Sequence, residues 1–117
     1  MDFSIRGARV EDAPALSQLI TSLGWFGELA AEDGAVTTAR VAGYLETLTS
    51  PDACHTVLVA DAQDFGVIGC AAVHWLPYLF LTGEEGYLSQ LFVEEAHRGV
   101  GIGTLLLDAV IARARDR

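Results

Sequence analysis

The run from Arg98 to Thr104 carries the clearest chemical signal in the sequence, because three glycines alternate there with other residues. Alternating glycines let the backbone turn tightly with its N–H groups on one side. An apolar stretch, residues 87–93, precedes the run, and a helical pattern, residues 105–117, follows it. The positive end of such a helix adds to the N–H donors. The pattern therefore predicts a cradle for an anionic group such as a phosphate. The alternative interpretation is an ordinary strand-to-helix turn.

The same run excludes one class of phosphate-binding loop and gives little support to another. The chain contains no lysine, and its seven basic residues are all arginine. A Walker A loop needs Gly-Lys-Ser/Thr, whereas Gly103 is followed by Thr104 and Leu105. A dinucleotide-binding fingerprint needs a third glycine three positions after the second, and these glycines do not have that spacing. The sequence therefore argues against a nucleotidase and offers no usable Rossmann signal.

The elements that position this loop follow from hydrophobic periodicity and capping residues. Strands are predicted at residues 3–7, 55–60, 67–75 and 87–93, with a hairpin turn through residues 61–66. Helices are predicted from Glu11 or Asp12 to Gly24, from Thr37 or Thr38 to Pro51, and after the glycines to residue 117. Antiparallel hairpins combined with a strand–helix exit predict an α/β (α+β) fold, a mixed sheet with helices packed against it.

Composition bounds the class of protein and its partners. The length of 117 residues predicts one domain, and 51% hydrophobic residues without an apolar run of about eighteen predict a globular chain with no membrane partner. The formal charge of −9 argues against nucleic acid and favours a cationic amine. No basic, apolar leader precedes Asp2, which predicts a cytoplasmic location.

The two cysteines, Cys54 and Cys70, lie in strand-like stretches without zinc-ligand spacing, so no metal site is predicted. We expect both to be buried structural thiols, because a free cysteine packs as a small hydrophobe. If the hairpin pairs Ala60 with Val67, Cys54 lies opposite Val73 and Cys70 opposite Val57, and no disulfide is expected.

The pattern Arg-x-x-Gly-x-Gly, filled by Arg98, Gly101 and Gly103, resembles the GNAT superfamily of acetyl-CoA-dependent N-acetyltransferases. Residues 86–97 look like that family's fourth strand and its connection to the pyrophosphate loop, and residues 3–12 look like its first strand and first helix. The resemblance covers essentially the whole chain. It implies a mixed, mostly antiparallel GNAT-like sheet. It also implies transfer of an acetyl group to a primary amine, of a small molecule or a protein, by direct attack in a ternary complex.

The resemblance also implies which residues hold acetyl-CoA. Backbone N–H groups between Arg98 and Thr104 would bind the pyrophosphate, while the strand at residues 91–93 would pair with the pantetheine arm. A bulge in that strand would turn an N–H toward the thioester oxygen. The predicted cofactor residues are Leu91, Phe92, Val93, Arg98, Gly99, Val100, Gly101, Gly103 and Thr104. Leu91 and Val93 can serve the core as well, because these contacts use the backbone.

The general base is not given by the resemblance. Many relatives carry a carboxylate one or two residues before the Leu-x-Val segment, where this chain has Ser89 and Gln90, and neither is a base at neutral pH. The candidate catalytic residues are His74, an imidazole on a predicted strand, and Glu85, which could act through water. The alternatives are a structural histidine and a solvated loop charge. Glu94, Glu95 and His97 are predicted to be surface residues.

The acceptor site in this superfamily draws on the loop between the first two helices, here with Trp25 and Phe26, and on the loop after the third strand. Loop aromatics can form an acceptor pocket, and they can equally cap the end of the core.

Members of the superfamily continue into a fifth strand, a helix and closing strands, whereas this sequence stops at Arg117. We therefore expect residues 1–117 to be a single, carboxyl-terminally truncated domain. An edge of the fourth strand would stay exposed, so we expect a homodimer or completion of the sheet by another chain. No tyrosine matches the family's general acid. A catalytically inactive CoA-binding or assembly module, completed by a partner, is the alternative function that Ser89 and Gln90 suggest.

Overall fold

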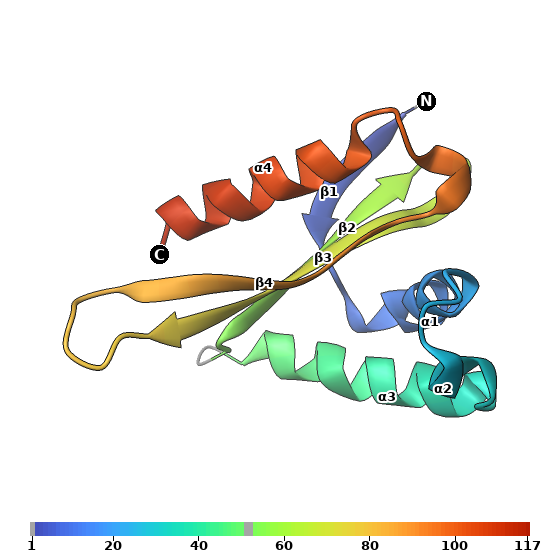
Figure 1. Ribbon diagram of the computed structural model, residues 1–117, viewed down its shortest axis with the longest axis horizontal. Helices are drawn as coiled ribbons and strands as arrows, with labels where there is room; N and C mark the ends of the chain where they lie inside the picture. Colours follow the sequence, from blue (N-terminus) through green and yellow to red (C-terminus); the bar gives the residue numbers. More distant parts are fainter. Residues whose placement is uncertain (1, 51–52) are drawn as a thin grey trace.

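The computed structural model describes residues 2–50 and 53–117 and contains a four-stranded sheet in the order β1-β2-β3-β4 (Figure 1). The strands are β1 (Phe3–Gly7), β2 (His55–Ala62), β3 (Gly66–Pro77) and β4 (Glu84–Val93). The α-helices are α1 (Ala13–Ser22), α2 (Gly27–Ala30), α3 (Gly34–Glu46) and α4 (Ile102–Arg115), and short 3-10 segments are η1 (Val10–Asp12), η2 (Thr47–Thr49) and η3 (Glu95–His97). The three strand pairings of the described residues are all antiparallel. The predicted α/β class and element order are confirmed.

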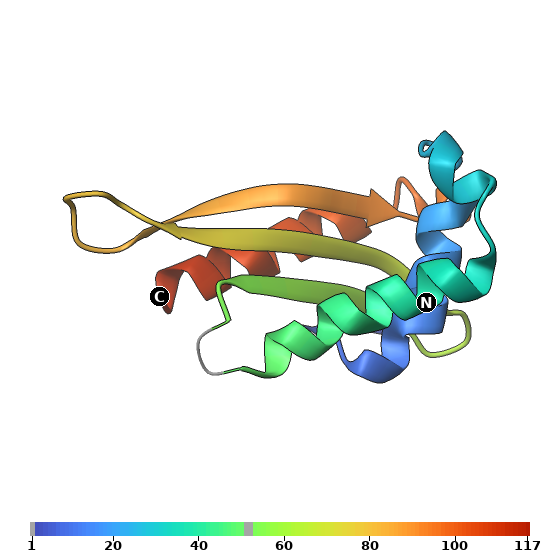
Figure 2. The same cartoon turned by 90° about the horizontal axis from the view of Figure 1, so that it is seen from below.

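The sheet separates two helical layers, with α4 on one face and α1 and α3 on the other (Figures 1 and 2). Successive strand residues point to opposite faces. Leu58, Ile68 and Val73 therefore pack with Ile102 and Leu106 of α4. On the opposite face, the buried side chains that pack together are Leu16, Leu19, Leu45, Val57, Val59, Cys70 and Phe92. Among the described residues, no helix has the length and apolar character to cross a bilayer.

A close approach between β3 and α4 brings the start of that helix onto the sheet. A β-carbon on Gly69 would lie 2.9 Å from the Phe92 carbonyl oxygen and 3.2 Å from Leu106 Cδ1. Only glycine leaves room for this contact. Gly69 thereby fixes the distance between the sheet and the first turns of α4, where the glycine-rich loop ends.

The β3–β4 hairpin projects beyond the rest of the sheet (Figure 2). Trp75 holds the two strands of this hairpin together. It is 2% exposed and packs against Gly86, where a β-carbon would lie 2.8 Å from the indole ring. The Arg117 guanidinium lies 4.8 Å from the centroid of the Trp75 ring and 2.9 Å from Glu84 Oε1. The carboxyl end of α4 is thus attached to the hairpin.

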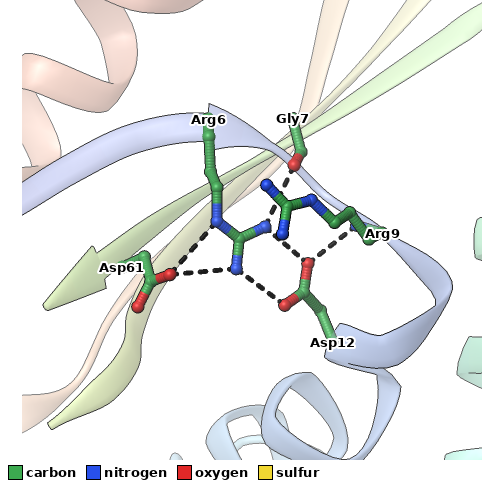
Figure 3. A network of polar contacts seen from close by, with 5 residues as sticks. All are labelled: Arg6, Gly7, Arg9, Asp12 and Asp61. Carbon is green, nitrogen blue, oxygen red and sulfur yellow. Dashed lines mark hydrogen bonds and ion pairs between the residues drawn. The ribbon is translucent and has the colours of Figure 1, made fainter. Parts of the chain in front are cut away.

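An arginine-centred polar network joins β1, β2 and η1 (Figure 3). The Arg6 guanidinium donates to both carboxylate oxygens of Asp12, at 2.8 and 2.9 Å, and to Asp61 Oδ2 at 3.1 Å. The Arg9 backbone N–H also donates to Asp12 Oδ2, at 2.7 Å. The hydrogen bond from Arg6 is the main cause that lowers the pKa of Asp12. The network sets the angle at which the chain leaves β1 and enters α1.

The start of the second long helix and the loop before it differ from the sequence prediction. This helix, α3, begins at Gly34, because the Asp33 side chain accepts a hydrogen bond from Ala35 N at 2.9 Å and caps the helix four residues before Thr37. The predicted loop before it contains the one-turn helix α2. Pro51, the predicted end of the helix, lies outside the described residues.

The predicted hairpin register is wrong, because the turn is shorter than residues 61–66. Strand β2 continues to Ala62 and β3 begins at Gly66, whose φ of +74° suits glycine. Asp61 lies opposite Val67, and a bulge at Ile68 then shifts the register by one residue, so Ala60 lies opposite Gly69 and Val59 opposite Cys70. Both cysteines are free. Cys70 is buried as expected, whereas the prediction for Cys54 is wrong: it precedes β2 and is exposed.

Candidate active site

The glycine-rich loop has the backbone shape that its sequence suggests. Gly99 and Gly101 have φ values of +85° and +87°, in the left-handed region that favours glycine. A β-carbon at either position would meet no atom within 4 Å, so these glycines are required for their φ angles and not for space. Gly103 lies in the first turn of α4, where a β-carbon would lie 3.7 Å from Val93 Cγ2.

The N–H groups of this loop are available to a ligand. The first backbone hydrogen bond of α4 runs from Leu105 N to Gly101 O, at 3.1 Å. Within residues 2–50 and 53–117, the backbone N–H groups of residues 99–104 make no well-aligned hydrogen bond. Such a set of donors at the positive end of a helix of fourteen residues is suited to an anion.

A cavity of about 460 Å³, here called the loop cavity, lies against these groups. It brings together seven of the nine predicted cofactor residues: Leu91, Val93, Arg98, Gly99, Gly101, Gly103 and Thr104. Two do not line it. Phe92 points to the opposite face of the sheet and packs with α1, and Val100 is 60% exposed at the outside of the loop.

Arg98 and His97 place cationic or ionisable groups at the loop cavity. Arg98 Nε donates to the Val93 carbonyl at 3.1 Å, and its guanidinium lies 5.7 Å from the centroid of the Trp25 ring. The prediction that His97 is a surface residue is wrong. Its side chain is 12% exposed, and its ring packs edge-on against Phe65 at 4.8 Å. No local sequence signal indicates this burial, because it comes from Phe65, which is far away in the chain.

Trp25 and Phe26 line a second cavity, of about 580 Å³, together with Glu28, Gln90 and Phe92. Here it is called the aromatic cavity. The two loop aromatics also lie edge-on to Phe92, with centroid distances of 5.5 and 6.1 Å. The structure therefore combines the two interpretations of this loop, because the same rings cover the core and form a cavity wall.

Ser89 forms a β-bulge in β4, and this bulge contacts His74. Ala72 lies opposite Gln90 and Val73 lies opposite Leu88, so Ser89 is the extra residue. The prediction of a bulge at residues 91–93 is wrong in position. The Ser89 hydroxyl donates to the Ala72 carbonyl at 3.3 Å, and His74 Nε2 lies 2.9 Å from the Ser89 hydroxyl oxygen. These contacts hold the unpaired residue in place.

A second histidine, His55, lies beside His74, with 6.0 Å between the ring centroids. The Thr47 hydroxyl donates to the Tyr44 carbonyl and lies 2.6 Å from His55 Nε2, while the Tyr44 ring stacks on the imidazole at 4.8 Å. Burial, and secondly the charge of His74, lowers the pKa of His55.

His74 and Ser89 line a third cavity, of about 420 Å³, between the sheet and helices α1 and α3. Here it is called the α3 groove. Glu85, the other predicted catalytic residue, does not line any of these three cavities and lies exposed opposite Leu76 in the projecting hairpin. The structure thus brings His74, but not Glu85, into this region. Among the described residues, no three His, Cys, Asp or Glu side chains are placed to share a metal ion.

Several solved structures share this fold. A transcriptional regulator from Bacillus halodurans C-125 has a TM-score of 0.79 at 22% identity, covering 99% of this chain and 76% of the other. The ribosomal-protein-alanine N-acetyltransferase from Brucella melitensis biovar Abortus 2308 has a TM-score of 0.74 at 21% identity, over 100% and 74%. A predicted acetyltransferase from Clostridium acetobutylicum, crystallised with acetyl-CoA, has a TM-score of 0.68 at 20% identity, over 99% and 75%.

No curated protein sequence matches the chain. The family model of the acetyltransferase (GNAT) family matches residues 21–117, which include the helical layer around α3, the β2–β4 sheet, the glycine-rich loop and α4. The chain therefore belongs to the GNAT acetyltransferase family.

Proposed function

We propose that this protein transfers an acetyl group from acetyl-CoA to a primary amine, of a small molecule or a protein, by direct attack in a ternary complex. The observation that carries the proposal is the set of unpartnered N–H groups at residues 99–104, which lie on the loop cavity at the start of α4. A diphosphate needs several donors without a strongly bound competitor, and these donors meet that requirement.

The residues of the loop cavity fit acetyl-CoA. The N–H groups of Gly99, Gly101, Gly103 and Thr104 would hold the pyrophosphate, with Arg98 and His97 beside them. The segment Leu91-Phe92-Val93 would follow the pantetheine arm, because β4 is an edge strand of the sheet and has one side free for strand-like hydrogen bonds. When bound, acetyl-CoA supplies an activated acetyl thioester.

His74 is the proposed general base. Because the Ser89 hydroxyl donates its proton to the Ala72 carbonyl, the Ser89 oxygen accepts from His74 Nε2–H. This tautomer leaves a lone pair on Nδ1. His74 is half-buried and lines the α3 groove. His74 Nδ1 would take the proton of the acceptor ammonium, directly or through a water molecule.

The aromatic cavity is the proposed entrance for the amine. Trp25 lines both this cavity and the loop cavity, so acceptor and cofactor would meet along β4. Glu28 supplies a carboxylate at the aromatic cavity, and the net charge of −9 attracts an ammonium ion.

A second chain is proposed to cover the free edge of β4. Leu105, Leu107 and Ile111 on α4 are 45%, 39% and 42% exposed, which is unusual for large apolar side chains on one helix. A second copy of the chain would cover them. Light scattering or sedimentation would measure this, and a monomer at all concentrations would contradict it.

The test of the proposed function is calorimetric titration with acetyl-CoA, in the wild type and in two charge-matched variants. Gly103→Glu places a carboxylate at the loop cavity, and we expect it to weaken binding at least about 100-fold through repulsion of the pyrophosphate. Ala112→Glu adds the same charge at an exposed residue of the same helix that lines neither that cavity nor the proposed contact with a second copy, and we expect it to bind normally. Absence of binding in the wild type, or equal losses in both variants, would overturn the proposal.

The alternative is a GNAT-like module that binds CoA, is completed by a partner and does not turn over. It is favoured by one observation: Ser89 and Gln90 stand where many relatives carry a carboxylate. Acetyl-CoA binding without acetylation of any amine in a broad panel would support this alternative.

A further inference from the structure

The α3 groove and the aromatic cavity adjoin each other, because Ile20, Gln90 and Phe92 line both. The two together are here called the trough. The aromatic cavity adjoins the loop cavity through Trp25, and the far end of the α3 groove reaches His74. An acceptor that enters beside Trp25 and places its amine near His74 therefore has its remaining atoms in contact with the walls of the trough.

Those walls are apolar along most of the groove. Helices α1 and α3 contribute Leu16, Ile20, Val41 and Leu45, and the sheet contributes Val57 and Phe92. The volume of about 420 Å³ falls in the range of sites that enclose small organic molecules, roughly 300–1,000 Å³. An apolar group of that size would displace water from these side chains on binding.

The charged and polar groups of the groove leave no place for a second ammonium. Arg40, the one formally charged side chain among its lining residues, is held by both carboxylate oxygens of Glu32, at 2.8 and 2.9 Å. The hydrogen bond from Arg40 holds the pKa of Glu32 below its ordinary value, so the pair stays ionised and mutually neutralised. The Ser89 hydroxyl is already used by Ala72 and His74. The lining contains no carboxylate.

We propose that the acceptor is a small primary amine with a single positive charge and one apolar body, of the arylalkylamine or branched alkylamine class. The body lies in the α3 groove, between Val41 of α3 and Phe92 of β4, and the amine lies toward His74 and Gln90. A polyamine or an aminoglycoside would have to desolvate further ammonium groups in the α3 groove, whose lining has no carboxylate, since Glu28 lines the aromatic cavity and not the groove. Such burial without a counter-charge is strongly unfavourable. The inference rests on the proposed acetyltransferase function and adds the substrate class.

The test compares 2-phenylethylamine with spermidine, an aminoglycoside such as kanamycin, and a short alanine-terminated peptide, with acetylated product measured by mass spectrometry. We expect kcat/KM for 2-phenylethylamine to exceed that for each of the other three at least tenfold. Val41→Phe fills the groove and should raise the KM for 2-phenylethylamine about tenfold or more, while leaving the Kd for acetyl-CoA unchanged. Val36→Phe is the matched control, because Val36 is on the same helix, is 50% exposed and does not line the groove.

Binding of 2-phenylethylamine to the protein without acetyl-CoA, followed by ligand-observed NMR, separates the two proposals. If no amine is acetylated but 2-phenylethylamine binds and Val41→Phe removes that binding, the groove assignment stands and the proposed function fails. If acetylation occurs with spermidine, kanamycin or the peptide as the preferred acceptor, the function stands and the groove assignment is overturned. The groove assignment is also overturned if Val41→Phe and Val36→Phe have equal effects. The same holds if 2-phenylethylamine is neither acetylated nor seen to bind by NMR.

Discussion

The imidazole of His74 lies among the rings of His55 and Tyr87, at centroid distances of 6.0 and 6.3 Å, and the hydroxyl of Ser89. The Ser89 contact depends on the bulge, because the unpaired residue brings its hydroxyl to the β3 side chain. Imidazole changes charge between pH 5 and 8, so a histidine held in one tautomer is suited to proton transfer near neutral pH. We therefore propose that His74, on the neighbouring strand, acts in place of the β4 carboxylate that many relatives carry.

Replacing His74 tests this assignment. We expect His74→Gln to lower kcat about 100-fold, the usual scale for loss of a general base, and to flatten the acid limb of the pH–rate profile. The Kd for acetyl-CoA should not change, because His74 does not line the loop cavity. Glu85→Gln is the control and should keep wild-type activity. Equal losses in the two variants, or a His74→Gln enzyme with an unaltered pH profile, would contradict the role of His74.

The two cysteines make a second prediction at the residue scale. Burial raises the pKa of the Cys70 thiol to about 12, whereas Cys54 is exposed. The thiolate is the reactive form, so native protein at pH 8 should take up one equivalent of iodoacetamide, at Cys54. Cys70 should react only after unfolding in denaturant. Intact mass and peptide mapping measure both steps, and a Cys54→Ser variant that still reacts quickly in the native state would contradict the prediction.

At the scale of elements, the link between strand β1 and helix α1 depends on one carboxylate. Asp12 accepts from the Arg6 guanidinium and from Arg9 N, and its side chain is 10% exposed. Asp61, which bonds to the same guanidinium, is 37% exposed. Asp12 therefore ties Arg6 of β1 and the backbone at Arg9 to η1 from a protected position, whereas Asp61 bonds to the Arg6 side chain from a more solvated one.

We expect Asp12→Ala to lower the free energy of unfolding by about 3 kcal/mol, because it leaves the half-buried Arg6 with Asp61 as its one carboxylate partner and removes the acceptor of Arg9 N. Asp61→Ala should cost less than about 1 kcal/mol, as is usual for solvated ion pairs. Urea denaturation of the two variants measures the difference. Similar losses for both would show that the network contributes through charge alone and not through the protected position of Asp12.

At the scale of the whole molecule, acid should weaken the fold in two separate ranges of pH. The pKa of His55 is lowered from its ordinary value of 6.5, and the pKa of Asp12 is lowered from 3.8. Each of these groups has a lower pKa in the native state than in the unfolded chain. Between the native and the unfolded pKa of the group, the unfolded chain therefore binds more protons than the native state. The stability attached to His55 is therefore complete above pH 6.5 and falls as the pH drops below it, and the Asp12 contribution is lost only below pH 3.8.

The His55 contribution can be isolated by comparing the wild type with His55→Gln in urea at pH 7.5 and at pH 5.5. We expect the wild type to lose more stability than the variant between these pH values, since the variant lacks the proton uptake of the imidazole on unfolding. Comparing the change in the free energy of unfolding between the two pH values cancels the cost of the lost Thr47 contact, because the variant lacks that contact at both pH values. A variant with the same or a larger acid sensitivity would contradict the prediction.

The sequence by itself determined the element order, the alternation of the core strands and the glycine-rich loop before α4, because periodicity, capping residues and glycine φ preferences act locally. Arg98, Gly101 and Gly103 sufficed to indicate the family. Local rules missed the start of α3, because Asp33 and Thr37, four residues apart, can both cap a helix.

Only the tertiary structure decided the rest. The hairpin register, the position of the bulge at Ser89 and the burial of His97 depend on contacts between residues far apart in the chain. The same is true of the trough, whose walls come from α1, α3 and three strands. Spacing along a sequence defines which backbone donors share a loop, whereas the packing of distant elements defines which side chains share a cavity.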